Sequence, residues 1–126
     1  MTFMSKLEKR YYEEVVVPGM KSGLLTDYKL QVKYKLQESF KYKGKTIREI
    51  NYISDFDLYY ADGHFEVIDT KGMSTADARI KKKMFHHEYP DIDFKWLSWT
   101  KATGWIEYDE LQKMRRDAKK KKKAKE

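Results

Sequence analysis

The chain has 126 residues, a mass of 15.2 kDa and a formal net charge of +7, and it contains no cysteine. A domain of this length buries a core without disulfides, and the absence of cysteine excludes a cysteine-based zinc site. Aromatic residues make up 15% of the chain, which excludes a wholly disordered protein. No apolar run approaches the ~18 residues that span a membrane, and the first residues carry no secretory signal, so we expect a cytoplasmic protein with no membrane partner.

The positive charge is concentrated near the C-terminal end. Residues 119–126 hold six lysines and one glutamate, a net charge of +5, which leaves +2 for residues 1–118. We therefore expect one folded domain over residues 1–118 and a disordered basic tail over residues 119–126 that adds non-specific affinity for DNA. A nearly balanced body favours a site that combines basic groups with carboxylates over a surface that only coats nucleic acid.

The first half of the chain predicts one helix followed by antiparallel strands. A helix is expected over residues 5–17, with Ser5 as its N-cap, Glu8 completing a capping box, and Pro18 ending it. Alternating apolar residues then predict three strands joined by tight turns. These strands cover residues 28–42, 46–60 and 64–71, and the turns lie at 43–45 and 62–63.

The second half predicts a helix over residues 74–88, a fourth strand over 91–97 and a last helix over 105–116. Because a helix connects the third strand to the fourth, the fourth strand is expected to run parallel to a neighbour. The predicted fold class is α/β, with a mixed sheet flanked by helices.

Two strands carry carboxylates in apolar surroundings. Asp69 and Lys71 share a face at the end of the third strand, just before Gly72 and a helix. In the preceding strand, Asp55 and Asp57 alternate with apolar residues, which places both on one face. An acid in such a strand is costly unless it is paired or binds a metal. A solvated face with cross-strand Asp–Lys pairs remains the alternative for these strands.

The first helix adds a third unusual carboxylate. Its apolar stripe contains Met4, Tyr11 and Val15, and Glu8 falls inside this stripe. The alternative is a partly exposed glutamate that serves only the capping box. Either interpretation predicts that Glu8 lies near the start of the helix.

Glu8, Asp55, Asp69 and Lys71 together resemble the active site of the PD-(D/E)XK nuclease superfamily, which has a helix acid, an Asp on one hairpin strand and D/E-x-K on the next. Ser54 stands where the family pattern has its nominal proline. The order αβββαβ is also similar to that fold, and more narrowly the chain resembles phage and prophage endonucleases of the Holliday-junction-resolving type. The similar stretches are 5–17, 30–37, 52–56, 67–72 and 80–90.

This resemblance implies a restriction-endonuclease-like fold and a metal-dependent DNA endonuclease that cuts branched DNA in phage recombination or replication. It implies Mg²⁺, with Mn²⁺ as a substitute, bound by Asp55, Asp69 and the backbone carbonyl of Thr70. Glu8 would bind a second ion or orient a water, and Lys71 would help to deprotonate or position the attacking water. Two cuts in a symmetric junction imply a homodimer, located in the host cytoplasm if the protein is phage-encoded.

Basic residues on the helix after the third strand are candidates for phosphate contacts, although a charged run is also typical of a solvated helix face. Two other functions stay open: a nicking or restriction-like nuclease that acts on other DNA, and a non-catalytic DNA-binding module on the same fold. The candidate DNA-binding residues are Arg79, Lys81, Lys82 and Lys83.

Overall fold

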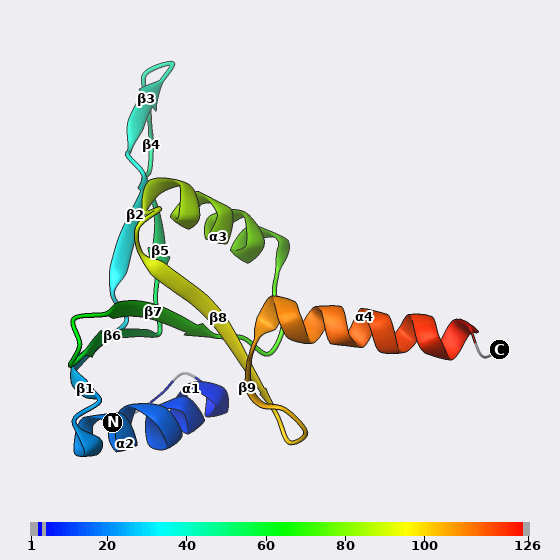
Figure 1. Cartoon of the computed structure of the whole chain (residues 1–126). Helices are drawn as coiled ribbons and strands as arrows, with labels where there is room; N and C mark the ends of the chain where they lie inside the picture. The colour runs from blue at the N-terminus through cyan, green and yellow to red at the C-terminus, as the bar shows by residue number, and fades with distance from the viewer. Residues whose placement is uncertain (1–2, 4, 125–126) are drawn as a thin grey trace.

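A mixed five-stranded sheet forms the centre of the computed structural model, which describes residue 3 and residues 5–124 (Figure 1). Its strand order is β1-β6-β7-β8-β9; β7 and β8 are parallel and the other neighbours are antiparallel. The predicted α/β class, and the parallel placement of the strand that follows the crossover helix, are therefore confirmed. The strands are β1 (Leu25–Leu30), β6 (Phe56–Tyr60), β7 (Phe65–Thr70), β8 (Asp93–Thr100) and β9 (Gly104–Glu107).

The two long strands predicted over residues 28–42 and 46–60 are each broken into three. They form one bent hairpin, in which β1 pairs with β6, β2 (Lys33–Gln37) with β5 (Ile50–Ile53), and β3 (Phe40–Tyr42) with β4 (Lys45–Ile47). One break lies at Gln31, whose φ is 56°. The β3–β4 end projects from the body of the molecule (Figure 1), and its predicted turn is confirmed, with positive φ at Lys43 and Gly44.

The first helix is longer than predicted. It runs as α1 (Lys6–Tyr11), a π-helical turn η1 (Tyr12–Val16) and α2 (Val17–Ser22). The predicted end at Pro18 is wrong because a π-helical turn directly precedes α2, and the helix continues through Pro18 near the start of α2. The helix ends instead at Gly23, whose φ of 83° is the left-handed conformation that glycine adopts without strain.

The C-terminal region also differs from the prediction. Residues 105–107, expected to be helical, form β9 because they pair with β8, for example Trp99 with Trp105. The last helix, α4 (Tyr108–Ala124), continues through the lysine run that was expected to be disordered. Lysine has a high helix propensity, and cations near a helix C-terminus interact favourably with its dipole. Residues 125–126 of the predicted tail, like Met4 of the apolar stripe, lie outside the described residues.

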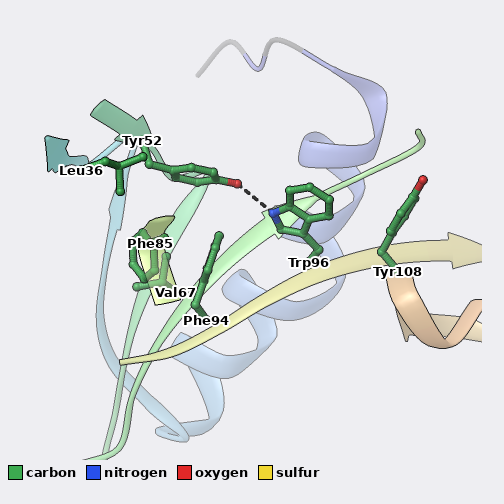
Figure 2. Packing of buried hydrophobic residues seen from close by; sticks show 7 residues of the cluster. All are labelled: Leu36, Tyr52, Val67, Phe85, Phe94, Trp96 and Tyr108. Carbon is green, nitrogen blue, oxygen red and sulfur yellow. Dashed lines mark hydrogen bonds between the residues drawn. The ribbon is translucent and has the colours of Figure 1, made fainter. Parts of the chain in front are cut away.

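Each face of the sheet has its own core. On one face the first helix packs with Tyr11 and Val16 against Phe56, Leu58 and Ile68. On the other face α3 (Ala76–Glu88), which begins at the N-cap Thr75, packs against β2 and β5. Figure 2 shows this second core, which contains Leu36, Tyr52, Val67, Phe85, Phe94, Trp96 and Tyr108.

The aromatic rings of the second core join α3 and β5 to β8. Phe85 of α3 contacts Phe94 with ring centroids 4.2 Å apart, and Tyr52 contacts Phe94 at 5.1 Å.

Among residues 5–124, no helix has both the length and the apolar character required to cross a membrane.

Candidate active site

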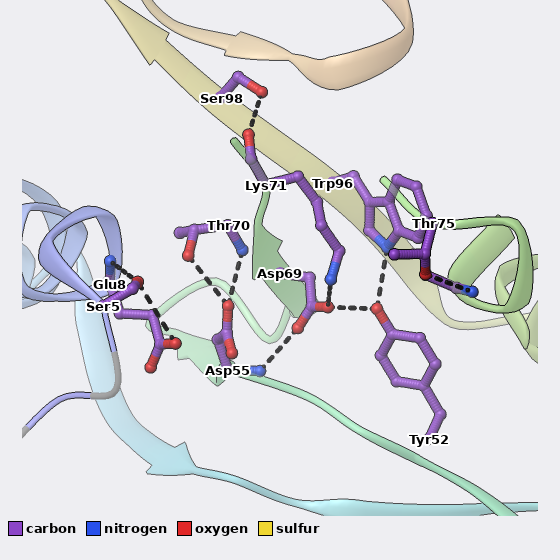
Figure 3. Close-up of polar contacts among 11 residues, drawn as sticks. Ser5, Glu8, Tyr52, Asp55, Asp69, Thr70, Lys71, Thr75, Trp96 and Ser98 are labelled. Atoms are coloured by element: carbon purple, nitrogen blue, oxygen red, sulfur yellow. Dashed lines mark hydrogen bonds and ion pairs between the residues drawn. The ribbon is translucent and has the colours of Figure 1, made fainter. Parts of the chain in front are cut away.

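The candidate site lies where β7 ends and where the bent hairpin breaks between β5 and β6. At this break the backbone N–H of Asp55 donates to Oδ1 of Asp69, with a distance of 2.9 Å (Figure 3). Oδ2 of Asp55 in turn accepts hydrogen bonds from the backbone N of Thr70 at 2.8 Å and from its Oγ1 at 3.0 Å. The break therefore replaces ladder pairing with side-chain contacts that hold the two aspartates together.

Asp69 is nearly inaccessible, with 3% of its surface exposed. Its Oδ2 accepts a short hydrogen bond from the Tyr52 hydroxyl and lies 3.0 Å from Nζ of Lys71. The Tyr52 hydroxyl also accepts a hydrogen bond from Nε1 of Trp96, at 2.9 Å. Tyr52 thus links Asp69 to the core, a role that the sequence analysis missed because an aromatic residue in a strand carries no local sign of such a contact.

Lys71 follows β7 and is held on its backbone by β8. Its N–H donates to the carbonyl of Leu97 at 2.7 Å, and its carbonyl accepts a hydrogen bond from the Ser98 hydroxyl. Its Nζ lies 5.0 Å from the centre of the Trp96 ring. The expected proximity of Asp69 and Lys71 is confirmed, and the lysine ammonium group points toward the Asp69 carboxylate.

Glu8 is brought to the same place by α1. The predicted N-cap is confirmed, since Oγ of Ser5 accepts a hydrogen bond from the backbone N of Glu8 at 3.1 Å. The Glu8 side chain is not the partly exposed capping glutamate of the alternative interpretation, because only 8% of the residue is exposed. Ser5 lies on the same side of the site and donates from Oγ to Oε1 of Glu8 at 3.5 Å.

Burial raises the pKa values of all three carboxylates. Burial raises the pKa of Asp55 to about 7, and the charges of Asp69 and Glu8 add to the effect. Burial also raises the pKa of Asp69, although Lys71 opposes the change. The pKa of Glu8 is raised by burial and then by the charge of Asp69. Three crowded acids therefore face one ammonium group, and an additional cation would relieve the excess negative charge.

The donor set suits a hard divalent cation. Asp55 and Asp69 offer carboxylate oxygens beside the backbone of Thr70, which is the ligand chemistry that Mg²⁺ prefers. Oδ2 of Asp55 accepts both bonds from Thr70, which leaves Oδ1 for another partner. The residues present therefore fit such an ion.

A different trio is the tightest cluster of potential metal ligands in the described part of the chain. His64, Glu66 and Asp93 have ligand atoms that all lie within 4.8 Å of one another, whereas Glu8 and the site aspartates do not form such a trio. The cluster lies at the start of β7, away from the candidate site, and Nζ of Lys95 is 2.6 Å from Glu66 and 3.6 Å from Asp93. Lys95 already supplies a cation there, so this cluster is an ion-pair network.

The prediction that Asp55 and Asp57 share a face is wrong, because the strand is broken between Ile53 and Phe56. Asp57 is 2% exposed and accepts hydrogen bonds from the hydroxyls of Tyr34 and Ser54, the latter at 2.7 Å. Asp55, in contrast, is bonded to Thr70. Asp57 therefore belongs to the core beside β2, and Asp55 belongs to the site.

The four basic residues predicted to bind DNA have different surroundings. Nζ of Lys82 is 2.9 Å from the Asp109 carboxylate of α4 and 4.7 Å from the Trp96 ring centre, so this ammonium group is already paired within the protein. Arg79 donates to the Ser74 carbonyl and hydroxyl. Lys83 lines a separate cavity with Leu36. Lys81, together with Asp69 and Lys71, lines a cavity of about 260 Å³. Of the four, Lys81 is the one that this cavity places beside the site.

Comparison with protein families identifies a match to most of the chain. Residues 1–104 match a family described as "Protein of unknown function (DUF1064)". This span contains all the candidate site residues and ends at the first residue of β9, before α4. Neither the curated proteins nor the solved structures give a match. Because the match covers most of the sequence, the chain belongs to the DUF1064 family.

Proposed function

We propose that the protein is a metal-dependent DNA endonuclease that hydrolyses phosphodiester bonds at the end of β7. The observation that supports this proposal is the gathering of Glu8, Asp55 and Asp69 around a single ammonium group, Lys71. Buried acids whose pKa values are raised are costly to folding and are typical of functional sites. The resemblance to PD-(D/E)XK nucleases assigns the same four residues to catalysis.

Asp55, Asp69 and the carbonyl of Thr70 are the proposed ligands of Mg²⁺ or Mn²⁺, and Glu8 completes the site through a second ion or a water. A divalent cation at this position supplies positive charge for the scissile phosphate and makes a nearby water more acidic. In its absence the carboxylates repel a phosphodiester, so the acids alone cannot bind the substrate at this point.

Lys71 has two roles in the proposal. Its ammonium group, fixed 3.0 Å from Asp69, orients the attacking water and balances the charge that develops on the phosphate oxygens. Its position is set by the backbone bonds to Leu97 and Ser98 and does not depend on substrate. Such prior orientation lowers the barrier because little reorganisation is needed when the substrate binds.

The proposed substrate is branched DNA, cut by a homodimer as in Holliday junction resolution, in the cytoplasm of the phage host. A junction is distinguished by shape and backbone geometry, and a protein that contacts phosphates reads these features without contacting bases. Two active sites at a fixed separation would match the two scissile phosphates of a four-way junction.

The test is a cleavage assay on end-labelled four-way junction, linear duplex, single strands and RNA, each with Mg²⁺, Mn²⁺, Ca²⁺ or EDTA. We expect cleavage of DNA with Mg²⁺ or Mn²⁺, and none with EDTA. Ca²⁺ should support binding with little cleavage because it is a poorer activator of water. Asp69→Asn, purified in parallel, should be inactive, whereas Asp91→Asn, which changes an exposed aspartate outside the site, should be as active as the wild type. Cleavage by Asp69→Asn at the wild-type rate would refute the proposal.

A further inference from the structure

We infer that a basic cavity next to Lys71 binds a backbone phosphate of the DNA strand that passes through the active site, and that α4 continues this contact outward. The inference rests on the proposed function for its substrate. It assigns the binding surface to α1 and α4, not to the α3 residues Arg79, Lys82 and Lys83 that the sequence favours.

The cavity has a volume of about 320 Å³ and lies between α1, the end of β8 and α4. Its charged lining consists of Lys6 and Arg10 from α1, Lys71 from the candidate site and Arg115 from α4. Among the described residues that line it there is no carboxylate. Lys71 pairs with Asp69 and Arg10 with Glu14, but neither carboxylate lines the cavity. A lining of four cations without an acid favours an anion as the ligand, and a phosphate group is the anion that a nucleic acid presents.

One of these cations is held in place by an aromatic ring of the cavity lining. The guanidinium of Arg10 stacks on the ring of Trp99, with Cζ 3.6 Å from the ring centre, and its Nη1 lies 3.4 Å from Oε2 of Glu14. A stacked guanidinium loses less conformational freedom on binding a phosphate. Lys6 and Arg115 are exposed and approach the cavity from opposite helices.

Lys71 connects this cavity to the candidate site. It lines the basic cavity and also the smaller cavity that contains Asp69 and Lys81. A strand whose scissile phosphate lies at Asp69 would therefore present a neighbouring phosphate to Lys6 and Arg115. The position of the cavity makes it a subsite for the same strand.

The direction of α4 extends the positive surface away from the body. The helix projects outward from the sheet (Figure 1), and Arg115, Lys119 and Lys122 share one of its faces because they are spaced by four and three residues. All three are exposed. Since Arg115 lines the cavity, this basic face extends from the cavity along the helix, where it would contact one arm of the DNA duplex.

The experiment compares Lys6→Gln/Arg115→Gln with the matched control Lys21→Gln/Lys113→Gln, which also removes two exposed charges, one from α2 and one from the opposite face of α4. All proteins carry Asp69→Asn so that no cleavage occurs. Binding of a fluorescein-labelled duplex, four-way junction and single-stranded RNA is measured by anisotropy at several salt concentrations, and circular dichroism checks that each variant is folded. A single Arg115→Gln variant provides the measurement if the double variant does not fold.

The double variant is expected to bind DNA about tenfold more weakly at low salt, and the slope of log K against log salt should fall by about two. Lys21→Gln/Lys113→Gln should retain the affinity and slope of its parent. Equal affinities for the double variant and the control would overturn the inference while leaving the nuclease proposal intact. Weakening confined to RNA would overturn the DNA assignment. Conversely, weaker DNA binding by the double variant, combined with cleavage by Asp69→Asn in the cleavage assay, would support the cavity and refute the assignment of Asp69 to the active site.

Discussion

Oδ2 of Asp55 accepts hydrogen bonds from both the backbone N and the Oγ1 of Thr70, at 2.8 and 3.0 Å, across a break in the hairpin. These bonds fix the Asp55 carboxylate beside the residue whose carbonyl is a proposed metal ligand. They also hold a charged group in a place where burial and two other acids oppose its ionisation. The stability of the site and its chemistry are therefore coupled through this contact.

The first prediction concerns pH and stability. Asp55 has an ordinary pKa of 3.8 and a native pKa of about 7, so the native state binds more protons than the unfolded state between these values. The free energy of unfolding should therefore fall as the pH rises through this range. In EDTA, we expect the wild-type Tm to be lower at pH 8 than at pH 5, and Asp55→Asn to show a smaller decrease.

Ionisation of Asp55 should lower the free energy of unfolding by on the order of 2–4 kcal/mol between pH 5 and pH 8. Thermal unfolding followed by circular dichroism at the two pH values measures it, with Asp91→Asn as the control that keeps the wild-type dependence. Added Mg²⁺ should raise the wild-type Tm at pH 8 more than that of Asp55→Asn, since a ligand stabilises the state that binds it. An identical pH dependence in Asp55→Asn and the wild type would contradict the assignment.

The second prediction concerns Lys71. Lys71→Gln keeps a polar side chain of similar length but removes the ammonium group that lies 3.0 Å from Asp69. Cleavage at saturating DNA should fall by about 100-fold or more, because the charge acts on the reacting phosphate. Lys71→Arg should not restore the rate, since a planar guanidinium cannot occupy the same position. The measurement is single-turnover cleavage; a variant that changes only the DNA concentration needed for half-maximal rate would show that Lys71 serves binding alone.

The third prediction tests Tyr52 as a positioning residue. Tyr52→Phe removes the hydroxyl that donates to Asp69 and leaves Nε1 of Trp96 without its acceptor. A buried group that loses its partner costs about 1–3 kcal/mol. We expect a lower Tm, a lower cleavage rate, and a higher Mg²⁺ concentration for half-maximal cleavage, because Asp69 becomes less well oriented. Tyr42→Phe, at an exposed position of β3, is the control. An unchanged Mg²⁺ dependence would show that the role of Tyr52 is purely structural.

The strongest sequence signals for the site were local. Strand alternation placed Asp69 beside Lys71, and the Ser5–Glu8 spacing located the start of the helix; the structure contains both features. The proximity of Glu8 to the two aspartates required the order of the elements as well, because it depends on how α1 packs against the sheet. These relationships follow from short-range periodicity combined with topology.

The features that the sequence did not predict depend on contacts between distant residues or on unusual backbone geometry. Gln31 interrupts the hairpin at a positive φ, although no glycine or proline marks that position. The π-helical turn before Pro18 allowed the helix to pass a residue that normally ends one. Lys82 is paired with Asp109, which is 27 residues away, so its exposure could not be judged from the helix pattern alone. Such contacts override local propensity.

The last prediction concerns the choice of substrate. If two copies of the chain form a dimer, their active sites lie at a fixed separation, and a four-way junction presents two equivalent phosphates that a linear duplex does not. When junction and duplex of the same sequences are mixed at equal phosphate concentration, the junction should therefore be cut in preference to the duplex, with paired incisions. Sedimentation velocity at the assay concentration should give a dimer. Equal rates on the two substrates, or an active monomer, would favour a nicking or restriction-like nuclease. In that case Glu8, Asp55, Asp69 and Lys71 would keep their proposed roles, because hydrolysis of one phosphodiester requires only one site.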